Sequence, residues 1–331
     1  MLYNCQLSNI NYQLSTINCY KMIVIPDFIP EVAQKLTEST SLSLVQKIER
    51  QEITTCLSSE AHREGDFLEI SSAYVRQGNK GKPILLLHGF DSSLLEFRRL
   101  FPLLAEENET WAVDLLGFGF THRPSKISFD PVAIKTHLYY FWKSLIRQPV
   151  ILVGASMGGA AAIDFTLTYP EVVEKLVLID SAGLTQPPGI GKLMFPPLDR
   201  LATAFLKNSQ VRHNISRAAY YNKSLANEDA LLCTSLHLYL PGWQRALISF
   251  AKSGGYGSFA DRLETIDCPT LILWGANDGI LGTKDGEKFQ RAIAHSQLFW
   301  IDNSGHVPHL EQPEITAQHI LSKSPPLIRG I

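Results

Sequence analysis

The feature that most constrains this chain is a turn of small residues that directly follows an apolar run. Residues 151–159 read Ile-Leu-Val-Gly-Ala-Ser-Met-Gly-Gly, and residues 160–165 continue as a predicted helix. A serine at such a strand–turn–helix junction forms a nucleophile elbow, whose tight backbone leaves room only for small neighbours. Gly154 and Gly158 meet that demand on either side of Ser156. The helix N-terminus then favours negative charge beside the serine.

Two residues farther along the chain can complete this site. Asp278 follows one apolar run, and His306 lies on a loop after the next. A hydroxyl is a weak nucleophile, so it needs a base that takes its proton, and the base needs a carboxylate that sets its tautomer. We therefore predict Ser156 as the nucleophile, His306 as the base and Asp278 as the acid. Asp180 also follows an apolar run and stays open as the alternative acid.

An earlier segment can supply hydrogen-bond donors for a developing oxyanion. There an apolar run ends in His88, Gly89 and Phe90. In proteins with this elbow, one oxyanion-hole amide belongs to the residue after the nucleophile and the other to the loop after this early strand. We therefore predict the backbone N–H groups of Phe90 and Met157 as the oxyanion hole. We expect His88 to shape the loop and His309 to be a buried histidine rather than a catalytic one.

These motifs, in this chain order, resemble the α/β-hydrolase family over residues 66–321. Residues 114–119, Asp-Leu-Leu-Gly-Phe-Gly, are similar to the family's Asp-x-x-Gly-x-Gly turn, and residues 305–314 resemble its histidine loop and the helix that follows. The resemblance implies an α/β fold with a mostly parallel central sheet, helices on both faces and a helical cap inserted between two strands. Apolar runs that alternate with helical stretches favour the same buried sheet. The predicted strands are 67–76, 84–87, 110–115, 150–153, 175–180, 271–274 and 298–301.

The chain divides into a predicted core and segments outside it. Residues 1–21 repeat with a period of seven and are rich in Asn, Ser and Gln, so we predict disorder there, with Met22 as an alternative start. Residues 22–182 and 264–323 form the predicted hydrolase core. The apolar spacing over 30–52 predicts an amphipathic helix in its first part.

The stretch between the two core segments differs in character. Residues 183–263 lack the strand pattern and carry many aromatic side chains. Their place between two sheet strands resembles the lid, or cap, of the family, which implies that they roof the catalytic serine and line the substrate pocket. Tyr239 and Trp243 are the substrate contacts that we predict within this lid.

Composition and charge narrow the classes of function. The net charge of −2 gives no overall field that would recruit nucleic acid. No apolar run reaches the ~18 residues of a membrane-spanning helix, and the amino end lacks the layout of a signal peptide. The five dispersed cysteines disfavour a disulfide framework or a zinc cluster. We expect a cytoplasmic protein without metal or cofactor, because residues 117–119 also lack the third glycine of a dinucleotide fingerprint. No oligomeric state is predicted.

The identity of the nucleophile selects among the reactions of the family. Family members that form an alkyl-enzyme ester carry aspartate at the elbow, whereas serine serves acyl transfer. We therefore predict a carboxylesterase-like serine hydrolase that cleaves a small or medium apolar ester, a small-molecule substrate, through an acyl-enzyme on Ser156.

Two other functions stay open. Serine and a similar lid also serve C–C bond hydrolases of ring-cleavage products, but these usually carry an aromatic residue where Val307 follows the histidine. Their oxyanion loop is also richer in glycine than residues 89–93 of this chain. The second alternative is a ligand-binding protein that keeps the fold with little turnover, which the intact set of catalytic residue types argues against.

Overall fold

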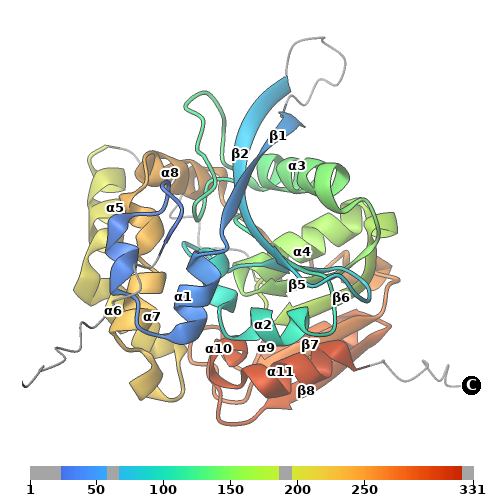
Figure 1. Ribbon diagram of the computed structural model, residues 1–331. Helices are drawn as coiled ribbons and strands as arrows, with labels where there is room; N and C mark the ends of the chain where they lie inside the picture. Colours follow the sequence, from blue (N-terminus) through green and yellow to red (C-terminus); the bar gives the residue numbers. More distant parts are fainter. Residues whose placement is uncertain (1–23, 58–66, 186–195, 323–331) are drawn as a thin grey trace, which may run out of the picture.

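Eight strands form a single sheet with the order β1-β2-β4-β3-β5-β6-β7-β8 (Figure 1). The computed structural model describes residues 24–57, 67–185 and 196–322, so the segment 1–21 that we predict to be disordered lies outside the described residues. β1 pairs with β2, and β2 with β4, in antiparallel fashion, whereas the other neighbouring strands are parallel. The strands are β1 (Glu49–Cys56), β2 (Phe67–Gln77), β3 (Ile84–Leu87), β4 (Thr110–Val113), β5 (Val150–Ala155), β6 (Val173–Ile179), β7 (Thr270–Gly275) and β8 (Ser296–Ile301).

The central strands are apolar on both faces, as a parallel sheet between two layers of helices requires. All four residues of β3 and all six residues of β7 are buried. The antiparallel edge strand β1 differs, because only Ile53 and Thr55 are buried there and their neighbours are accessible. Most continuous apolar runs of the sequence therefore correspond to buried inner strands, whereas the run 298–301 lies in the edge strand β8, where Phe299 and Trp300 are exposed.

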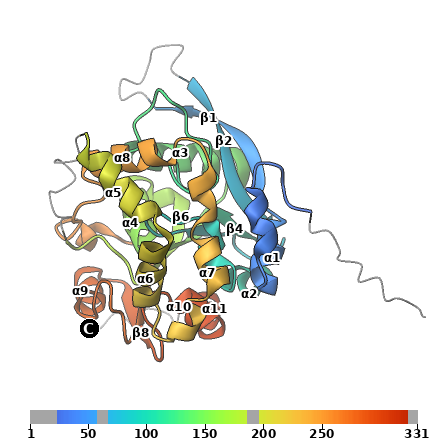
Figure 2. The ribbon, with the colours of Figure 1, turned by 90° about the vertical axis from the view of Figure 1, so that its left-hand side faces the viewer.

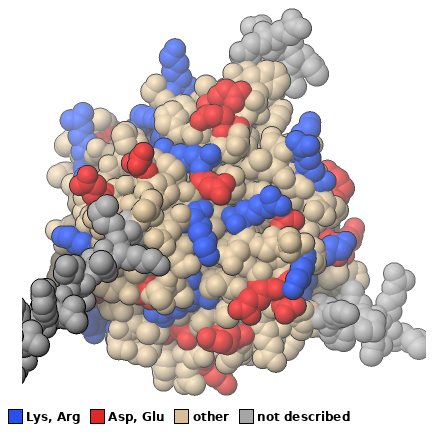
Figure 3. All heavy atoms as spheres, viewed as in Figure 1, with Lys and Arg blue, Asp and Glu red and all other residues tan. Residues whose placement is uncertain are grey.

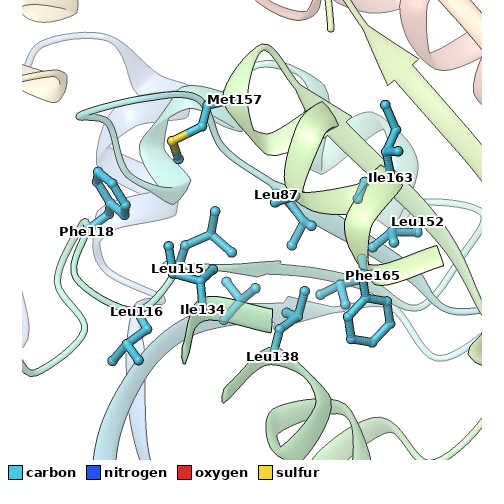
Figure 4. Packing of buried hydrophobic residues seen from close by; sticks show 14 of the residues in the cluster. Leu87, Leu115, Leu116, Phe118, Ile134, Leu138, Leu152, Met157, Ile163 and Phe165 are labelled. Carbon is cyan, nitrogen blue, oxygen red and sulfur yellow. The ribbon is translucent and has the colours of Figure 1, made fainter. Parts of the chain in front are cut away.

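Helices cover both faces of the sheet. On one face, α3 and α4 pack through side chains such as Leu138 and Phe165 against Leu152 of β5 (Figure 4). On the other face, α2 and α11 contribute Leu104 and Ile320 to a second apolar cluster. The helices of the core are α1 (Ser39–Val45), α2 (Leu100–Ala105), α3 (Pro131–Phe141), α4 (Met157–Thr168), α9 (Lys284–Ala292), α10 (Pro308–Glu311) and α11 (Pro313–Leu321). The predicted α/β fold, with a mostly parallel sheet between helices, is confirmed.

The amphipathic helix predicted over residues 30–52 is wrong for most of its length. The structure has a short 3-10 helix, Glu31–Lys35, then α1, and β1 already begins at Glu49. Between the two short helices, two backbone N–H groups donate to the carboxylate of Asp229 at 2.5 and 2.9 Å, which breaks the helical path. From Glu49 onward the chain pairs with β2, and burial alternates around Ile53 as in a strand. Partners distant in the sequence therefore override the apolar spacing.

The described residues between β6 and β7 form several helices, and we call the part from residue 196 to residue 263 the insertion. Its helices are α5 (Leu198–Lys207), α6 (Ser209–Ala219), α7 (Glu228–Cys233) and α8 (Trp243–Ser253), and its described part contains no strand. α5, α6 and α7 lie together at the left of the core in Figure 1 and face the viewer in Figure 2. α8 joins the apolar cluster of the core through Leu247 and Phe250.

The molecular surface agrees with the small net charge. Lys and Arg side chains are interspersed with Asp and Glu over the face seen in Figure 3, so that face shows no region of a single sign. Within the described ranges, no helix has both the length and the hydropathy needed to cross a membrane.

Candidate active site

Ser156 lies where the sequence predicts it, on a sharp turn between β5 and α4. Its backbone adopts φ 52° and ψ −117°, a combination that residues with a side chain seldom adopt. Packing enforces this turn: a side chain on Gly154 would overlap the carbonyl of Gly158, and one on Gly158 would overlap the carbonyl of Leu87. The Ser156 carbonyl also accepts the N–H of Ala182 at 3.0 Å, just after β6. The surrounding chain therefore holds a strained serine at the carboxyl edge of the sheet.

His306 and Asp278 contact each other at the same edge. Asp278 follows β7 and His306 follows β8, and the carboxyl ends of the parallel strands β5, β7 and β8 share one edge. The Nδ1 atom of His306 lies 3.0 Å from Oδ2 of Asp278, and both side chains are buried. Burial alone would raise the pKa of Asp278, but His306 and the N–H groups of Ile280 and Leu281 lower it. An ionised Asp278 keeps the proton of His306 on Nδ1 and leaves Nε2 free to act as a base.

Asp180, the alternative acid, lies beside this pair but ionises less readily than Asp278. One oxygen of Asp180, one of Asp278 and one ring nitrogen of His306 lie within 4.8 Å of one another. Asp180 is fully buried, and its Oδ1 accepts the N–H of Gly275 at 3.0 Å. Burial, and then the neighbouring Asp278, raise the pKa of Asp180 well above its ordinary range. Asp180 therefore resists ionisation more than Asp278 does, which favours Asp278 as the acid that orients His306.

The same three groups form a cluster that is tight enough for a metal ion. Among the residues that the structure describes, it is the one such cluster of His, Cys, Asp or Glu ligand atoms. The facing atoms of His306 and Asp278 are nevertheless bonded to each other at 3.0 Å. A cation would have to displace the proton between them, so the donor set fits proton transfer better than metal binding.

The loop after β3 passes directly beside the elbow. A side chain on Gly89 would come within 3.4 Å of the Cβ atom of Ser156. Phe90 follows Gly89 in this loop, and Met157 is the first residue of α4, where a backbone N–H has no acceptor within the helix. The two residues predicted to form the oxyanion hole therefore border the serine from two different segments.

His88 holds the start of this loop from within the core. Its Nδ1 lies 2.8 Å from the carbonyl oxygen of Gly89, and its Nε2 accepts the N–H of Leu115 at 3.1 Å. Burial lowers the pKa of His88 to about 4, so the ring is neutral with its proton on Nδ1. Because both ring nitrogens are engaged, His88 shapes the loop rather than moving protons.

The Asp-x-x-Gly-x-Gly turn braces the same loop. Asp114 accepts the backbone N–H groups of Leu94 and Phe120, each at 2.6 Å. Gly119 has φ 51°, and a side chain there would overlap the carboxyl group of Asp114. The turn therefore supports the segment after β3, which carries the predicted oxyanion-hole residue Phe90.

Glu96 links the oxyanion loop to the histidine segment, and sequence reasoning missed it. Its carboxylate accepts the N–H of Gly89 at 3.0 Å and lies 3.4 Å from Nε2 of His309, a buried residue shortly after His306. Burial would raise the pKa of Glu96, but His309 above all lowers it to about 2. One carboxylate thus fixes two segments of the site, and a lone glutamate offers no sequence pattern that could have revealed it.

Asp91 fastens the helical insertion to the oxyanion loop, and sequence reasoning missed it as well. Its carboxylate accepts hydrogen bonds from Arg212 at 2.7 Å, from His237 at 3.1 Å and from the indole N–H of Trp243 at 2.7 Å. None of the four side chains is more than 9% exposed. Burial would raise the pKa of Asp91, but His237, Arg212 and Trp243 lower it to about 2. The residue next to Phe90 is therefore held by three side chains of the insertion.

The two aromatic residues predicted to contact substrate lie in different surroundings. Trp243 begins α8, is 6% exposed and donates its indole N–H to Asp91. Tyr239 ends the 3-10 helix Leu236–Tyr239 and is 63% exposed. Trp243 thus anchors the insertion, and substrate contact by either residue stays a prediction.

Replacing Asp91 by asparagine should destabilise the protein, and more at neutral pH than in acid. A pKa lowered from 3.8 to about 2 corresponds to about 2 kcal/mol of stability. This contribution is fully present above the ordinary pKa and is lost as the pH falls towards the folded value. Urea unfolding at several pH values should therefore show a constant difference from wild type above about pH 5 and a shrinking one below about pH 4. The exposed Asp302→Asn is the control, and a pH-independent difference for Asp91→Asn would contradict the assignment.

The chain also resembles known proteins along most of its length. Residues 82–313 match the family described as alpha/beta hydrolase fold. The Alpha/beta hydrolase domain-containing protein VTE7 of Arabidopsis thaliana is 34% identical over 291 residues, which are 87% of each chain. The 2-hydroxy-6-oxo-6-(2'-aminophenyl)hexa-2,4-dienoic acid hydrolase of Metapseudomonas resinovorans is 28% identical over 263 residues, 76% of this chain and 87% of that protein. Among solved structures, a thermophilic esterase from Thermogutta terrifontis superposes with a TM-score of 0.68 at 24% identity, over 82% of this chain and 96% of that chain. The chain therefore belongs to the α/β-hydrolase family.

Proposed function

We propose that this protein is a serine hydrolase that cleaves small or medium apolar esters through an acyl-enzyme on Ser156. The observation that carries the proposal is the 3.0 Å contact between His306 Nδ1 and Asp278, at the sheet edge where the strained Ser156 lies. That contact sets the imidazole tautomer that a base requires, and the elbow presents the hydroxyl beside the oxyanion loop.

Both halves of the proposed reaction use the same groups. The Ser156 Oγ atom attacks the ester carbonyl carbon while Nε2 of His306 takes its proton. The backbone N–H groups of Phe90 and Met157 stabilise the resulting oxyanion. His306 then gives its proton to the leaving alcohol as the ester C–O bond breaks, and the acyl group stays on Ser156. His306 then takes a proton from a water molecule that attacks the acyl carbon, and it gives this proton to Ser156 Oγ as the acyl C–O bond breaks and the carboxylic acid leaves.

Aromatic side chains beside the oxyanion loop support an apolar substrate. The Phe90 ring is 47% exposed and lies 6.1 Å from the Phe118 ring and 6.0 Å from the Phe250 ring of α8. Tyr256 continues this wall, 6.0 Å from Phe250. Because burial of apolar surface stabilises by about 25 cal/mol per Å², an apolar acyl chain is favoured here over a charged one. The insertion, which supplies Phe250 and Tyr256, acts in this proposal as the lid over Ser156.

The kcat/KM for p-nitrophenyl esters should rise from acetate to butyrate and fall for much longer chains. Two added methylenes contribute at most about 0.8 kcal/mol each, which allows up to roughly a fifteenfold rise. Replacing Phe250 by alanine should flatten this rise, whereas Phe250→Leu should largely preserve it. A steady increase through long acyl chains would contradict a closed pocket under a lid.

The predicted contacts Tyr239 and Trp243 can be tested with the same ester series. Tyr239→Ala is the cleaner variant, because the indole of Trp243 also holds Asp91. We expect Tyr239→Ala to flatten the chain-length dependence while a fluorophosphonate still labels Ser156. An unchanged dependence would remove Tyr239 from the substrate pocket.

A C–C bond hydrolase is the second candidate, since a relative with 28% identity is named a hexa-2,4-dienoic acid hydrolase. Turnover of 2-hydroxy-6-oxo-2,4-heptadienoate, followed by its absorbance, decides between the two reactions. We expect a higher kcat/KM for p-nitrophenyl butyrate, and the reverse ranking would transfer the proposal to C–C bonds. Covalent labelling without turnover of either compound would instead favour a ligand-binding protein.

A further inference from the structure

Helix α5 of the insertion exposes its apolar side chains and buries its polar ones. Leu198, Leu201 and Phe205 lie on one side of the helix and are 48%, 62% and 62% exposed. The polar residues Asp199 and Thr203 lie on another side and are only 5% and 1% exposed. A surface helix of a globular protein ordinarily turns its apolar stripe towards the core. Within the described part of the chain, the apolar side of α5 faces outward instead.

Polar contacts with α8 hold α5 in this orientation. The hydroxyl of Thr203 accepts a hydrogen bond from Gln244 at 2.6 Å, and the carboxylate of Asp199 lies 3.8 Å from the ammonium group of Lys252. Both partners belong to α8, which is itself packed on the core through Phe250. Turning the apolar side of α5 inward would break both contacts, so its exposure is built into the packing of the insertion.

The exposed charged residues of α5 are both positive. Along residues 196–227 the sequence contains a single acidic residue, the buried Asp199. The two exposed cations of α5 are Arg200 and Lys207. A side with large apolar groups and accompanying Lys and Arg is the composition of helices that lie in the interface of an anionic membrane.

We propose that the α5 docking face, formed by Leu198, Leu201 and Phe205, binds a lipid bilayer that carries anionic headgroups. The three apolar side chains enter the region between headgroups and acyl chains, and the flanking cations meet the lipid phosphates. The net charge of −2 for the whole chain does not oppose this, because at physiological salt charges act over only about 8 Å.

Docking by this face also places the bilayer near the candidate active site. The carbonyl of Ala219, the last residue of α6, accepts the N–H of His306 at 2.7 Å, and α6 packs against α5. Helix α6 thus connects the α5 docking face with the histidine loop, so an apolar ester dissolved in the bilayer would approach the site from this side of the molecule. This consequence rests on the proposed function, whereas the docking itself does not.

Flotation of the full chain with lipid vesicles tests the proposal. We expect the wild-type protein to float with phosphatidylcholine vesicles that contain phosphatidylglycerol, and less so with phosphatidylcholine alone. The double variant Leu201→Ser, Phe205→Ser should lower this partitioning at least about tenfold, because two large apolar groups no longer leave water. Val132→Ser on α3, where the side chain is 63% exposed, is the matched control and should leave partitioning unchanged. Arg200→Gln with Lys207→Gln, or added salt, should weaken binding to the anionic vesicles only.

Two results would overturn the proposal. One is wild-type protein that floats with neither kind of vesicle. The other is a dimer in solution that the double serine variant dissociates, since the α5 docking face would then join two copies of the chain. Hydrolysis of water-soluble p-nitrophenyl acetate keeps the two proposals apart: the double serine variant should retain it. Vesicle binding without hydrolysis by the wild type would refute the ester function alone.

Discussion

Replacing Ser156 by alanine should abolish both ester hydrolysis and covalent labelling by a fluorophosphonate. Loss of a triad serine lowers kcat on the order of 10⁶-fold, and the oxyanion hole and binding can leave a residual of about 10³ over water. The fold should persist, because alanine keeps the Cβ atom and removes only the hydroxyl from a turn that packing enforces. The measurements are p-nitrophenyl butyrate turnover and mass spectrometry of the labelled peptide.

Ser181 offers a matched control for this experiment. It is a buried serine near the elbow whose hydroxyl donates to the carbonyl of Ala182 at 2.7 Å, whereas Ser156 is partly accessible. Ser181→Ala should therefore retain labelling at Ser156 and most of the turnover. A labelled peptide without Ser156, or an alanine variant at 156 as active as wild type, would remove the nucleophile from the proposal.

Asp278→Asn should lower kcat by roughly 10⁴-fold while the fold survives. The carboxylate accepts from His306 at 3.0 Å and from the N–H groups of Ile280 and Leu281 at 2.7 and 3.1 Å. An asparagine can keep the contacts with the backbone, but its amide can donate to Nδ1 and so stabilise the wrong imidazole tautomer. The loss should therefore appear in kcat, with unfolding by urea little changed.

Asp180→Asn is the internal control, since its side chain lies in the same cluster. Asparagine has nearly the shape of Asp180 and keeps an acceptor for the N–H of Gly275, and it removes a carboxyl group whose ionisation burial already disfavours. We expect a loss of activity far smaller than that of Asp278→Asn. The opposite ranking of the two variants would assign the catalytic acid to the end of β6.

Local patterns predict the interior of this fold well. The run 84–87 has the bounds of β3, and 271–274 lies within β7. Both strands are buried on each face, so their hydrophobicity is continuous and easily read. The elbow around Ser156 is equally local, because its glycines are required by contacts within a few residues or with the adjacent strand.

Other parts of the structure have no local signature. Asp91 meets Arg212, His237 and Trp243 across 121 to 152 residues of chain, and nothing around Asp91 in the sequence marks it as their partner. The helix predicted over residues 30–52 includes the first four residues of the edge strand β1, because the strand character of β1 depends on pairing with β2. Residues that join distant segments therefore emerge only when the chain is folded.

The place of the helical insertion has a consequence for how such a chain can diverge. β6 and β7 are neighbours in the sheet, with Leu176 opposite Thr270, although the described residues between them, 180–185 and 196–269, lie outside the sheet. The entropy of closing a flexible loop grows only with the logarithm of its length, by about 0.6 kcal/mol for each doubling. Related proteins can therefore have a longer, shorter or different segment between these two strands with little change in the free energy of pairing them. What each replacement must still provide is a set of donors for the buried carboxylate of Asp91.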